Sequence, residues 1–373
     1  MQSFAAQRSD LTRLAERDRY RALSPRSGID FASNDYLALS RSARLRSAAI
    51  AALEAGVGLG SGGSRLLRGN CDEHEALEAE AAAWCGSEAA LFFSSGFAAN
   101  TTLLATLPQR GDLVVHDALI HASAIEGMRL GRAEFVSAGH NDAASFDDAI
   151  RQWRLRGGKG TAWLAVESLY SMDGDRAPLA ELLAIADRHE AVLLVDEAHA
   201  TGVFGARGVG LAEGLDGRPN VISLRTCGKA LGCEGALVCG PAVVRDFLVN
   251  RGRGFIFSTA PSPLAARLVR ESLRIAADEP ERRERLWDLV DTAERELRAL
   301  GVALSGSQIV PVIIGDDART MQIASAVRAA GFDVRGIRPP TVPAGTSRLR
   351  ISLTLNASPN DVRALAAVLG EAL

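Results

Sequence analysis

The sequence predicts an α/β protein in which a mostly parallel sheet forms a large domain and a smaller α+β domain accompanies it. Short apolar runs in the middle of the chain are continuous rather than alternating, as in strands buried on both faces. Helical patterns separate several of these runs, as crossover helices do in parallel sheets. After about residue 265 the pattern changes to a long charged helix and fewer strands.

The elements of the large domain follow in chain order. Each apolar run has the length of a buried strand and ends in polar or glycine residues. These runs are EAALFFSSG, GDLVVHD, TAWLAVES, AVLLVDEAH, NVISLRT and GALVCG. Between them, SFDDAIRQWRL and PLAELLAIADRHE have helical periodicity. Because open α/β sheets bind ligands at the carboxyl ends of their strands, we expect the functional site there.

The smaller domain is expected from the N-terminal and C-terminal segments. ERRERLWDLVDTAERELRALGV predicts an amphipathic helix, IVPVIIG and SRLRISLTL predict strands, and TMQIASAVRAAGF predicts a helix between them. In the last helix Ser358 suits the N-cap, Pro359 the first helical position and Asp361 the first turn. We therefore divide the chain into residues 1–50 (N-terminal helix and part of the small domain), 51–265 (large domain) and 266–373 (C-terminal small domain).

The composition excludes several classes of protein. The chain has 373 residues and a net charge of −3, and no block of basic residues points to nucleic acid or to a membrane surface. The charged N-terminus lacks the apolar core of a signal peptide, and the longest charge-free run, residues 89–109, is too polar for a membrane span. The five cysteines form no C-x-x-C pair and the histidines no H-E-x-x-H motif, so we expect a cytoplasmic protein without a metal site.

One lysine stands in a segment that is poor in charge. Lys229 lies in SLRTCGKALGCEGALVCG, among apolar residues and glycines. A lysine in such surroundings can lose its proton, and the neutral amine is a nucleophile towards carbonyls. The alternative is that Lys229 caps a turn and points to water.

An aspartate ends another apolar run. In AVLLVDEAHATGVFG, Asp196 follows the buried strand and His199 comes three residues later. A carboxylate there needs a cationic partner, unless it is an N-cap or part of a structural ion pair. The protonated pyridine nitrogen of pyridoxal phosphate is a suitable partner, and the aldehyde of that cofactor needs a lysine. Asp196 and Lys229 are one strand-and-loop unit apart.

Other residues can complete such a site. In FFSSGFAAN the backbone N–H groups of Ser95, Gly96 and Phe97 would lie at a helix N-terminus that opens at about Phe97, where phosphate binds readily. Thr226 can add a hydroxyl and His121 an aromatic ring, although a lone histidine is more often a core or surface residue. The glycine-rich GVGLGSGGSR either wraps phosphate or is a flexible loop, and it lacks the end of a P-loop.

Taken together, the motifs resemble the α-oxoamine synthases, which are fold-type-I pyridoxal-phosphate enzymes that condense an amino acid with an acyl thioester. The motifs are FASNDYLALS, GSGGSRLLRGN, LFFSSGFAAN, IHASAIEG, YSMDGDRAPL, VDEAHATGVFG, TCGKALG and FSTAPSP. The resemblance covers the chain from about Tyr20 to its C-terminus. It implies a homodimer with active sites at the subunit interface.

The resemblance also implies roles for individual residues. Lys229 would form the Schiff base, Asp196 would pair with the pyridine nitrogen, His199 would bind the phenolic oxygen and His121 would stack on the ring. Further cofactor contacts would come from Gly96, Phe97, Ser171 and Thr226, with Ser258 and Thr259 reaching the phosphate of the partner subunit. Arg350 and Asn34 would hold the amino acid carboxylate, and Arg21 and Thr341 would contact the acyl substrate. His121 would also contact the substrate, at the amino acid carboxylate or at the oxyanion that forms.

The segment IRPPTVPAGTSRLRISL resembles most closely the family member of the biotin pathway. This implies L-alanine and a pimeloyl thioester, carried by CoA or by a carrier protein, as substrates. The alternatives are a sister enzyme that uses glycine and acetyl-CoA, and a non-catalytic subunit of the same fold, which the presence of Lys229 argues against. A dinucleotide-binding oxidoreductase would need G-x-G-x-x-G after a strand, and GVGLGSGGS lacks such a strand.

Overall fold

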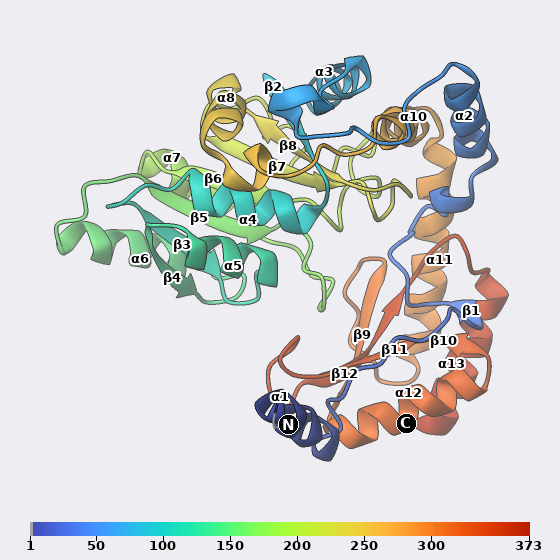
Figure 1. Ribbon diagram of the computed structural model, residues 1–373. Coiled ribbons are helices and arrows are strands. Elements are labelled where there is room, and N and C mark those ends of the chain that lie inside the picture. Colours follow the sequence, from blue (N-terminus) through green and yellow to red (C-terminus); the bar gives the residue numbers. More distant parts are fainter. Residues whose placement is uncertain (1–2) are drawn as a thin grey trace. The chain divides into compact units, whose positions relative to one another are not determined.

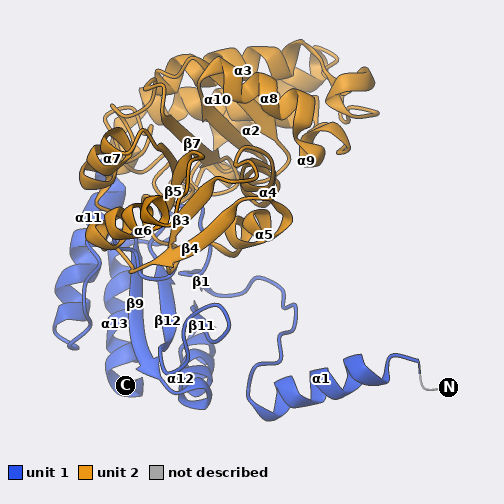
Figure 2. Ribbon diagram, turned by 90° about the vertical axis from the view of Figure 1, so that its left-hand side faces the viewer, with its two compact units in different colours: residues 1–36, 172–175, 284–373 blue, residues 37–171, 176–283 orange. Residues whose placement is uncertain are grey.

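The computed structural model describes residues 3–373, which form two compact units (Figure 2). Unit 1 consists of the described chain up to Tyr36 together with Met172–Asp175 and Glu284–Leu373, and unit 2 consists of Leu37–Ser171 and Arg176–Arg283. The boundaries of these units differ from those expected at residues 50 and 265, and the division into domains stays a prediction.

Unit 2 is built on a seven-stranded sheet in the order β2-β8-β7-β6-β5-β3-β4 (Figure 1). The strands are β2 (Ala89–Phe93), β3 (Leu113–Asp117), β4 (Glu134–Ala138), β5 (Ala162–Glu167), β6 (Val192–Asp196), β7 (Val221–Thr226) and β8 (Ala236–Gly240). The five strands from β4 to β7 are parallel, whereas β8 runs antiparallel to both β7 and β2. The expectation of a mostly parallel sheet is confirmed.

Helices cover both faces of this sheet because successive residues of a buried strand point to opposite sides. Leu91 and Phe93 of β2 pack in the core that contains residues of α4 and α5, whereas Ala90 and Phe92 pack in the core that contains residues of α3 and α10. The helices of unit 2 are η1 (Leu39–Arg41), α2 (Ala43–Glu54), η2 (Arg65–Gly69), α3 (Asp72–Cys85), α4 (Gly96–Thr106), α5 (Ala122–Leu130), α6 (Ala143–Leu155), α7 (Leu179–Arg188), α8 (Ala242–Arg251), α9 (Arg253–Ile256) and α10 (Pro263–Asp278).

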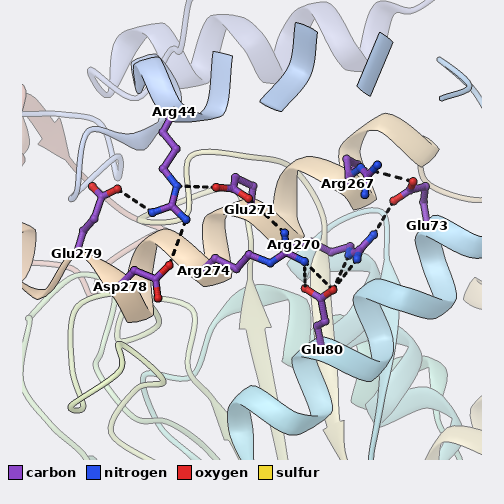
Figure 3. A network of polar contacts seen from close by, with 9 residues as sticks. All are labelled: Arg44, Glu73, Glu80, Arg267, Arg270, Glu271, Arg274, Asp278 and Glu279. Carbon is purple, nitrogen blue, oxygen red and sulfur yellow. Dashed lines mark hydrogen bonds and ion pairs between the residues drawn. The ribbon is translucent and has the colours of Figure 1, made fainter. Parts of the chain in front are cut away.

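A network of ion pairs joins α2, α3 and α10 (Figure 3). Arg44 on α2 lies 2.6 Å from Glu271 on α10, and Arg270 on α10 lies 2.6 Å from Glu80 on α3. The remaining members are Glu73, Arg267, Arg274, Asp278 and Glu279. Single surface ion pairs contribute little to stability, but shared partners fix several side chains at once, so this network holds the three helices together.

Unit 1 contains a three-stranded antiparallel sheet in the order β11-β12-β9 and a parallel pair of β1 and β10. Its elements are α1 (Ala5–Glu16), β1 (Ile29–Asp30), the part of α11 (Pro280–Arg298) from Glu284 onward, β9 (Ile309–Gly315), α12 (Asp317–Ala329), β10 (Phe332–Asp333), β11 (Arg335–Ile337), β12 (Ser347–Ser352) and α13 (Pro359–Ala372). The expected start of α13 is confirmed, because Ser358 and Asp361 form a reciprocal capping box. Across residues 3–373 no helix combines the length and the apolar character needed to cross a membrane.

Candidate active site

Four parallel strands of unit 2 end in polar residues. Because the strands are parallel, their carboxyl ends lie at one edge of the sheet. The final residues are Asp117 of β3, Glu167 of β5, Asp196 of β6 and Thr226 of β7. Asp196 and Thr226 are site residues predicted from the sequence, and this edge is where an open α/β sheet binds its ligand.

Lys229 lies in the turn after β7 and contacts His199, which follows β6. Lys229 Nζ is 2.7 Å from His199 Nε2. Two nitrogens at that distance share one proton, so one of them must be uncharged and accept the hydrogen bond. Lys229 is half-buried and His199 is buried. The lysine therefore does not extend into water as a surface cap, and its amine is held beside the end of β6.

Asp196 is buried at the end of β6 and is held from two directions. Its Oδ1 accepts a hydrogen bond of 2.9 Å from the N–H of Ala198, and its Oδ2 accepts one of 2.6 Å from Nδ2 of Asn100. Both donors belong to unit 2, one in the loop after β6 and one on α4. These bonds fix the orientation of the carboxylate at the edge of the sheet.

His121 is the N-cap of α5, and its Nδ1 accepts a hydrogen bond of 3.2 Å from the N–H of Ser123. Although His121 is an exposed residue, the protein around it desolvates the imidazolium, and this lowers the pKa of His121. The positive charge of Lys229 lowers that pKa further, whereas the carboxylate of Asp196 opposes the shift. The surroundings of His121 therefore favour the neutral form of its ring.

The expected phosphate site is the N-terminus of α4. Ser95 is the N-cap and its Oγ accepts from the N–H of Ala98, and the helix begins at Gly96, one residue before the expected start. A Cβ on Gly96 would lie 3.6 Å from Oγ1 of Thr226, so the hydroxyl of Thr226 stands close to the first N–H groups of the helix. N–H groups, a hydroxyl and the helix dipole together form a suitable site for a phosphate.

Three further residues expected at the cofactor belong to unit 2. Ser258 and Thr259 line a small pocket together with Ser94, which directly precedes the N-cap of α4. Ser171 is buried, and its N–H donates a hydrogen bond of 3.1 Å to Oε2 of Glu167. The backbone at Ser171 is thereby tied to the end of β5.

Apart from His121 of unit 2, the residues expected to bind substrate belong to unit 1, where they form two groups. In one group Nη2 of Arg350 donates to the hydroxyl of Tyr36 at 3.4 Å, and that hydroxyl donates to Oδ1 of Asn34 at 3.0 Å. In the other group Nη2 of Arg21 donates to Oγ1 of Thr341 at 3.2 Å, and both residues are exposed. Unit 1 thus connects Arg350 to Asn34 through Tyr36, and Arg21 contacts Thr341 directly.

Four residues with polar side chains in these hydrogen bonds were not predicted from the sequence: Tyr36, Asn100, Ser123 and Glu167. Glu167 gave the same signal as Asp196, since it is a charged residue at the end of an apolar run. The other three are neutral and polar, and only the folded structure shows which groups they contact.

The donors and acceptors of unit 2 match the chemistry of pyridoxal phosphate. Lys229 supplies an amine for its aldehyde, Asp196 a fixed carboxylate for its ring nitrogen, and the start of α4 with Thr226 supplies donors for its phosphate. The fold and these residues define a pyridoxal-phosphate-dependent enzyme of fold type I.

Comparison with known proteins agrees with this class. The family model for aminotransferase class I and II matches residues 26–369. The 8-amino-7-oxononanoate synthase of Anaeromyxobacter dehalogenans (strain 2CP-1) is 45% identical over 88% of this chain and 82% of its own. The chain belongs to the class I and II aminotransferase family, in the branch whose curated members are named 8-amino-7-oxononanoate synthase.

Solved structures show the same fold. A serine palmitoyltransferase variant from S. paucimobilis with bound PLP-myriocin has a TM-score of 0.90 and 28% identity, over 99% of this chain and 97% of that one. The 8-amino-7-oxononanoate synthase of Francisella tularensis has a TM-score of 0.78 and 27% identity, over 92% of this chain and 97% of that one. Both similarities extend over nearly the whole chain, so they include both compact units.

Proposed function

We propose that this chain catalyses the decarboxylating condensation of L-alanine with a pimeloyl thioester to give 8-amino-7-oxononanoate. The names of the curated relatives support this reaction. The observation that carries the proposal is the 2.7 Å contact between Lys229 Nζ and His199 Nε2, next to the strand that ends in Asp196. The amine of Lys229 and the carboxylate of Asp196 therefore both lie at one edge of the sheet.

The reaction needs only the two substrates and one proton from water. A carbon–carbon bond forms between the α-carbon of L-alanine and the thioester carbonyl carbon, and the carbon–sulfur bond breaks to release a thiol. The carboxyl group of alanine leaves as CO2 and a proton takes its place on the α-carbon, while the α-proton removed before the attack accounts for the proton of the thiol. When bound, pyridoxal phosphate supplies a ring that withdraws electrons from the α-carbon.

Residues of unit 2 would move and hold the protons. Lys229 would take the α-proton of alanine, a step for which its amine must be uncharged. Its contact with His199 keeps the amine in place and gives its proton a partner. His121 would hydrogen-bond the oxygen of the thioester carbonyl, where negative charge develops during the attack.

Residues of unit 1 would bind the substrates. A guanidinium has five N–H donors in a planar fork that suits a carboxylate. Arg350 uses Nη1 for Ser352 and Nη2 for Tyr36, and these bonds orient the fork that would hold the carboxylate of alanine with the help of Asn34. Arg21, placed by Thr341, would meet the distal carboxylate of the pimeloyl chain, and each methylene of that chain that is buried adds up to about 0.8 kcal/mol.

The assembly and the location of the protein are also proposals. The resemblance to the α-oxoamine synthases supports a homodimer, in which Ser258 and Thr259 would reach the phosphate bound by the partner. The acyl donor is a thioester of CoA or of a carrier protein, and both release a free thiol. The cysteine pattern supports a cytoplasmic location.

The test is an assay of thiol release with purified protein and pyridoxal phosphate. L-alanine and glycine are each combined with pimeloyl-CoA and acetyl-CoA, and L-serine with palmitoyl-CoA is added because similar solved structures are serine palmitoyltransferases. We expect L-alanine with pimeloyl-CoA to have the highest kcat/KM. A higher value for glycine with acetyl-CoA, or for serine with palmitoyl-CoA, would replace the proposed substrates and leave the cofactor site as described.

A further inference from the structure

A chain of hydrogen bonds connects Asp196 to His121 through two residues outside the predicted site. Nδ2 of Asn100 donates to Oδ2 of Asp196 at 2.6 Å and to Oγ of Ser123 at 3.1 Å. Oγ of Ser123 in turn lies 2.7 Å from Nδ1 of His121. The chain therefore runs from the carboxylate at the end of β6 to the ring at the start of α5.

The directions of the hydrogen bonds follow from the two ends of this chain, the carboxylate of Asp196 and the backbone N–H of Ser123, which donates to Nδ1 of His121. A carboxylate only accepts, so the amide of Asn100 must present its NH2 group to Asp196, and the same group donates to Ser123. The hydroxyl of Ser123 accepts that bond, and because Nδ1 of His121 is already an acceptor, the hydroxyl donates its proton to Nδ1. The N–H of Ser123 also donates to Nδ1, at 3.2 Å, so Nδ1 of His121 accepts twice and carries no proton.

The packing of α4 against α5 keeps the two middle members of this chain out of water. Asn100 is 2% exposed and Ser123 is fully buried, so water does not substitute for either donor. The two helices lie side by side (Figure 1), and Gly127 on α5 permits the approach. A Cβ at Gly127 would lie 2.9 Å from Cβ of Leu104 and 3.0 Å from the carbonyl oxygen of Asn100. A side chain there would push the helices apart and lengthen the bond between Asn100 and Ser123.

We propose that Asn100 and Ser123 are positioning residues that fix the tautomer of His121, with the proton on Nε2. A neutral imidazole has one donor nitrogen, and two donors aimed at Nδ1 leave Nε2 as that nitrogen. His121 then offers an N–H, and not a lone pair, to a carbonyl or carboxylate oxygen of the ligand. The use of this N–H in the reaction rests on the proposed function, whereas the tautomer itself does not.

The same chain affects the protonation of His121. Imidazolium carries a proton on Nδ1, which conflicts with the two donors from Ser123, so these donors favour the neutral ring. The charged groups that act on His121 are Asp196 from the end of β6 and Lys229 from the turn after β7. Because Ser123→Ala changes neither of these charges nor any charge of the bound cofactor, a change in the pKa of His121 in that variant reports the loss of the hydroxyl.

The experiment is a 15N–1H NMR spectrum of the histidine side chains in the cofactor-loaded protein labelled with 15N-histidine. The chain has six histidines, and the spectrum of His121→Gln assigns the signal. The variants are Ser123→Ala, Asn100→Asp and Ser123→Thr. Ser123→Ala removes the hydroxyl donor, and Ser123→Thr keeps the hydroxyl. In Asn100→Asp the new carboxyl group shares a proton with Asp196 and accepts a hydrogen bond from Ser123, which draws the hydroxyl proton away from His121. Circular dichroism during heating establishes whether each variant is folded. If Asn100→Asp does not fold, the comparison of Ser123→Ala with Ser123→Thr still tests the proposal.

We expect His121 in the original protein to carry its proton on Nε2. In Ser123→Ala the ratio of the Nε2–H to the Nδ1–H tautomer should fall about fivefold, as for the loss of one ordinary hydrogen bond, and the pKa of His121 should rise. Asn100→Asp should change the tautomer ratio and the pKa in the same directions as Ser123→Ala does. Ser123→Thr should keep the ratio and the pKa of the original protein. A proton on Nδ1 in the original protein, or an unchanged ratio and pKa in Ser123→Ala, would overturn the proposal even if thiol release proceeds as expected. The converse result, the expected tautomer in a protein that releases no thiol, would refute only the proposed reaction.

Discussion

Glu167 and Asp196 lie directly opposite each other at the ends of the parallel strands β5 and β6. Both side chains are buried, but their surroundings differ. Asp196 accepts hydrogen bonds from Asn100 and Ala198, whereas only Oε2 of Glu167 accepts one, from Ser171. Oε1 of Glu167 has no hydrogen-bond partner among residues 3–373. Burial, opposed only in part by Lys229 and reinforced by Asp196 and Asp117, raises the pKa of Glu167 well above that of an ordinary glutamate.

The stability of the protein should therefore fall as the pH rises, because of Glu167. The unfolded chain releases this proton above the ordinary pKa of a glutamate, near 4.3, while the folded chain retains it up to the raised pKa. Between those two values the folded state binds more protons, so the free energy of unfolding decreases with pH. Glu167→Gln keeps the shape and removes the proton.

Urea unfolding measures the free energy of unfolding of this variant and of the original protein between pH 5 and pH 8. This free energy should decline less in the variant, by about 1.4 kcal/mol for each pH unit of this range that lies below the raised pKa of Glu167. The exposed Glu134→Gln is the control and should leave the decline unchanged. An equal decline in Glu167→Gln and in the original protein would show that Glu167 is charged in the folded state.

Lys229 should be the residue that binds the cofactor covalently. Only two of the 42 basic residues are lysines, Lys159 and Lys229, so the chain contains its own control. After treatment with borohydride, peptide mass mapping should find a pyridoxyl group on Lys229 and none on Lys159. Lys229→Ala should bind the cofactor without turnover, and Lys159→Ala should retain activity. An adduct on Lys159 alone would contradict the assignment.

Arg350 and Arg21 should affect different substrates. Arg350→Ala removes the proposed partner of the alanine carboxylate and should raise KM for L-alanine by about tenfold or more, since a charge-assisted hydrogen bond is worth roughly 1.5–3 kcal/mol. Arg21→Ala should raise KM mainly for pimeloyl-CoA, and less because Arg21 is exposed. Steady-state kinetics with each substrate varied in turn separates the two effects. If both variants altered the same KM, the assignment of separate substrates would be wrong.

A buried ion pair supports the loop between β6 and β7. Arg225 on β7 is fully buried, and its Nη2 lies 2.6 Å from Oδ2 of Asp216. Asp216→Ala would leave the guanidinium buried without this partner, which typically costs about 3–5 kcal/mol. Asp148→Ala removes a carboxylate that is 73% exposed and should cost less than about 0.5 kcal/mol. Urea unfolding of both variants is the measurement, and similar values for the two would show that the buried pair adds no stability.

The protein should be a homodimer in solution. Analytical ultracentrifugation should give twice the chain mass of 39.4 kDa. Ser258→Ala combined with Thr259→Ala should weaken cofactor binding, and mixing this double variant with Lys229→Ala should produce some dimers that have one intact site. A monomer that keeps full activity on dilution would rule out a shared site.

Much of the fold was predictable because its strands are continuous apolar runs. All six strands predicted for the large domain are present in unit 2, from β2 to β8. The exception is β4, which was not predicted. It is an edge strand whose first four residues are exposed, so it contains a glutamate and a serine and lacks the apolar run of a buried strand.

The candidate site was predictable where a charge stands in an apolar segment. Lys229 and Asp196 were found in this way, and Glu167 carried the same signal. Asn100 and Ser123 were not found, since a neutral polar residue is ordinary in a helix. Their roles depend on the close approach of α4 and α5, which a single sequence does not reveal.

The most direct test of the account is to follow the carboxyl carbon of alanine through the reaction. The purified protein is incubated with pyridoxal phosphate, pimeloyl-CoA and L-alanine labelled with 13C in the carboxyl group. Mass spectrometry should find the label in CO2, unlabelled 8-amino-7-oxononanoate, and free CoA in equal amount. A condensation product that keeps the labelled carbon, or labelled CO2 without a condensation product, would contradict the proposed decarboxylating condensation.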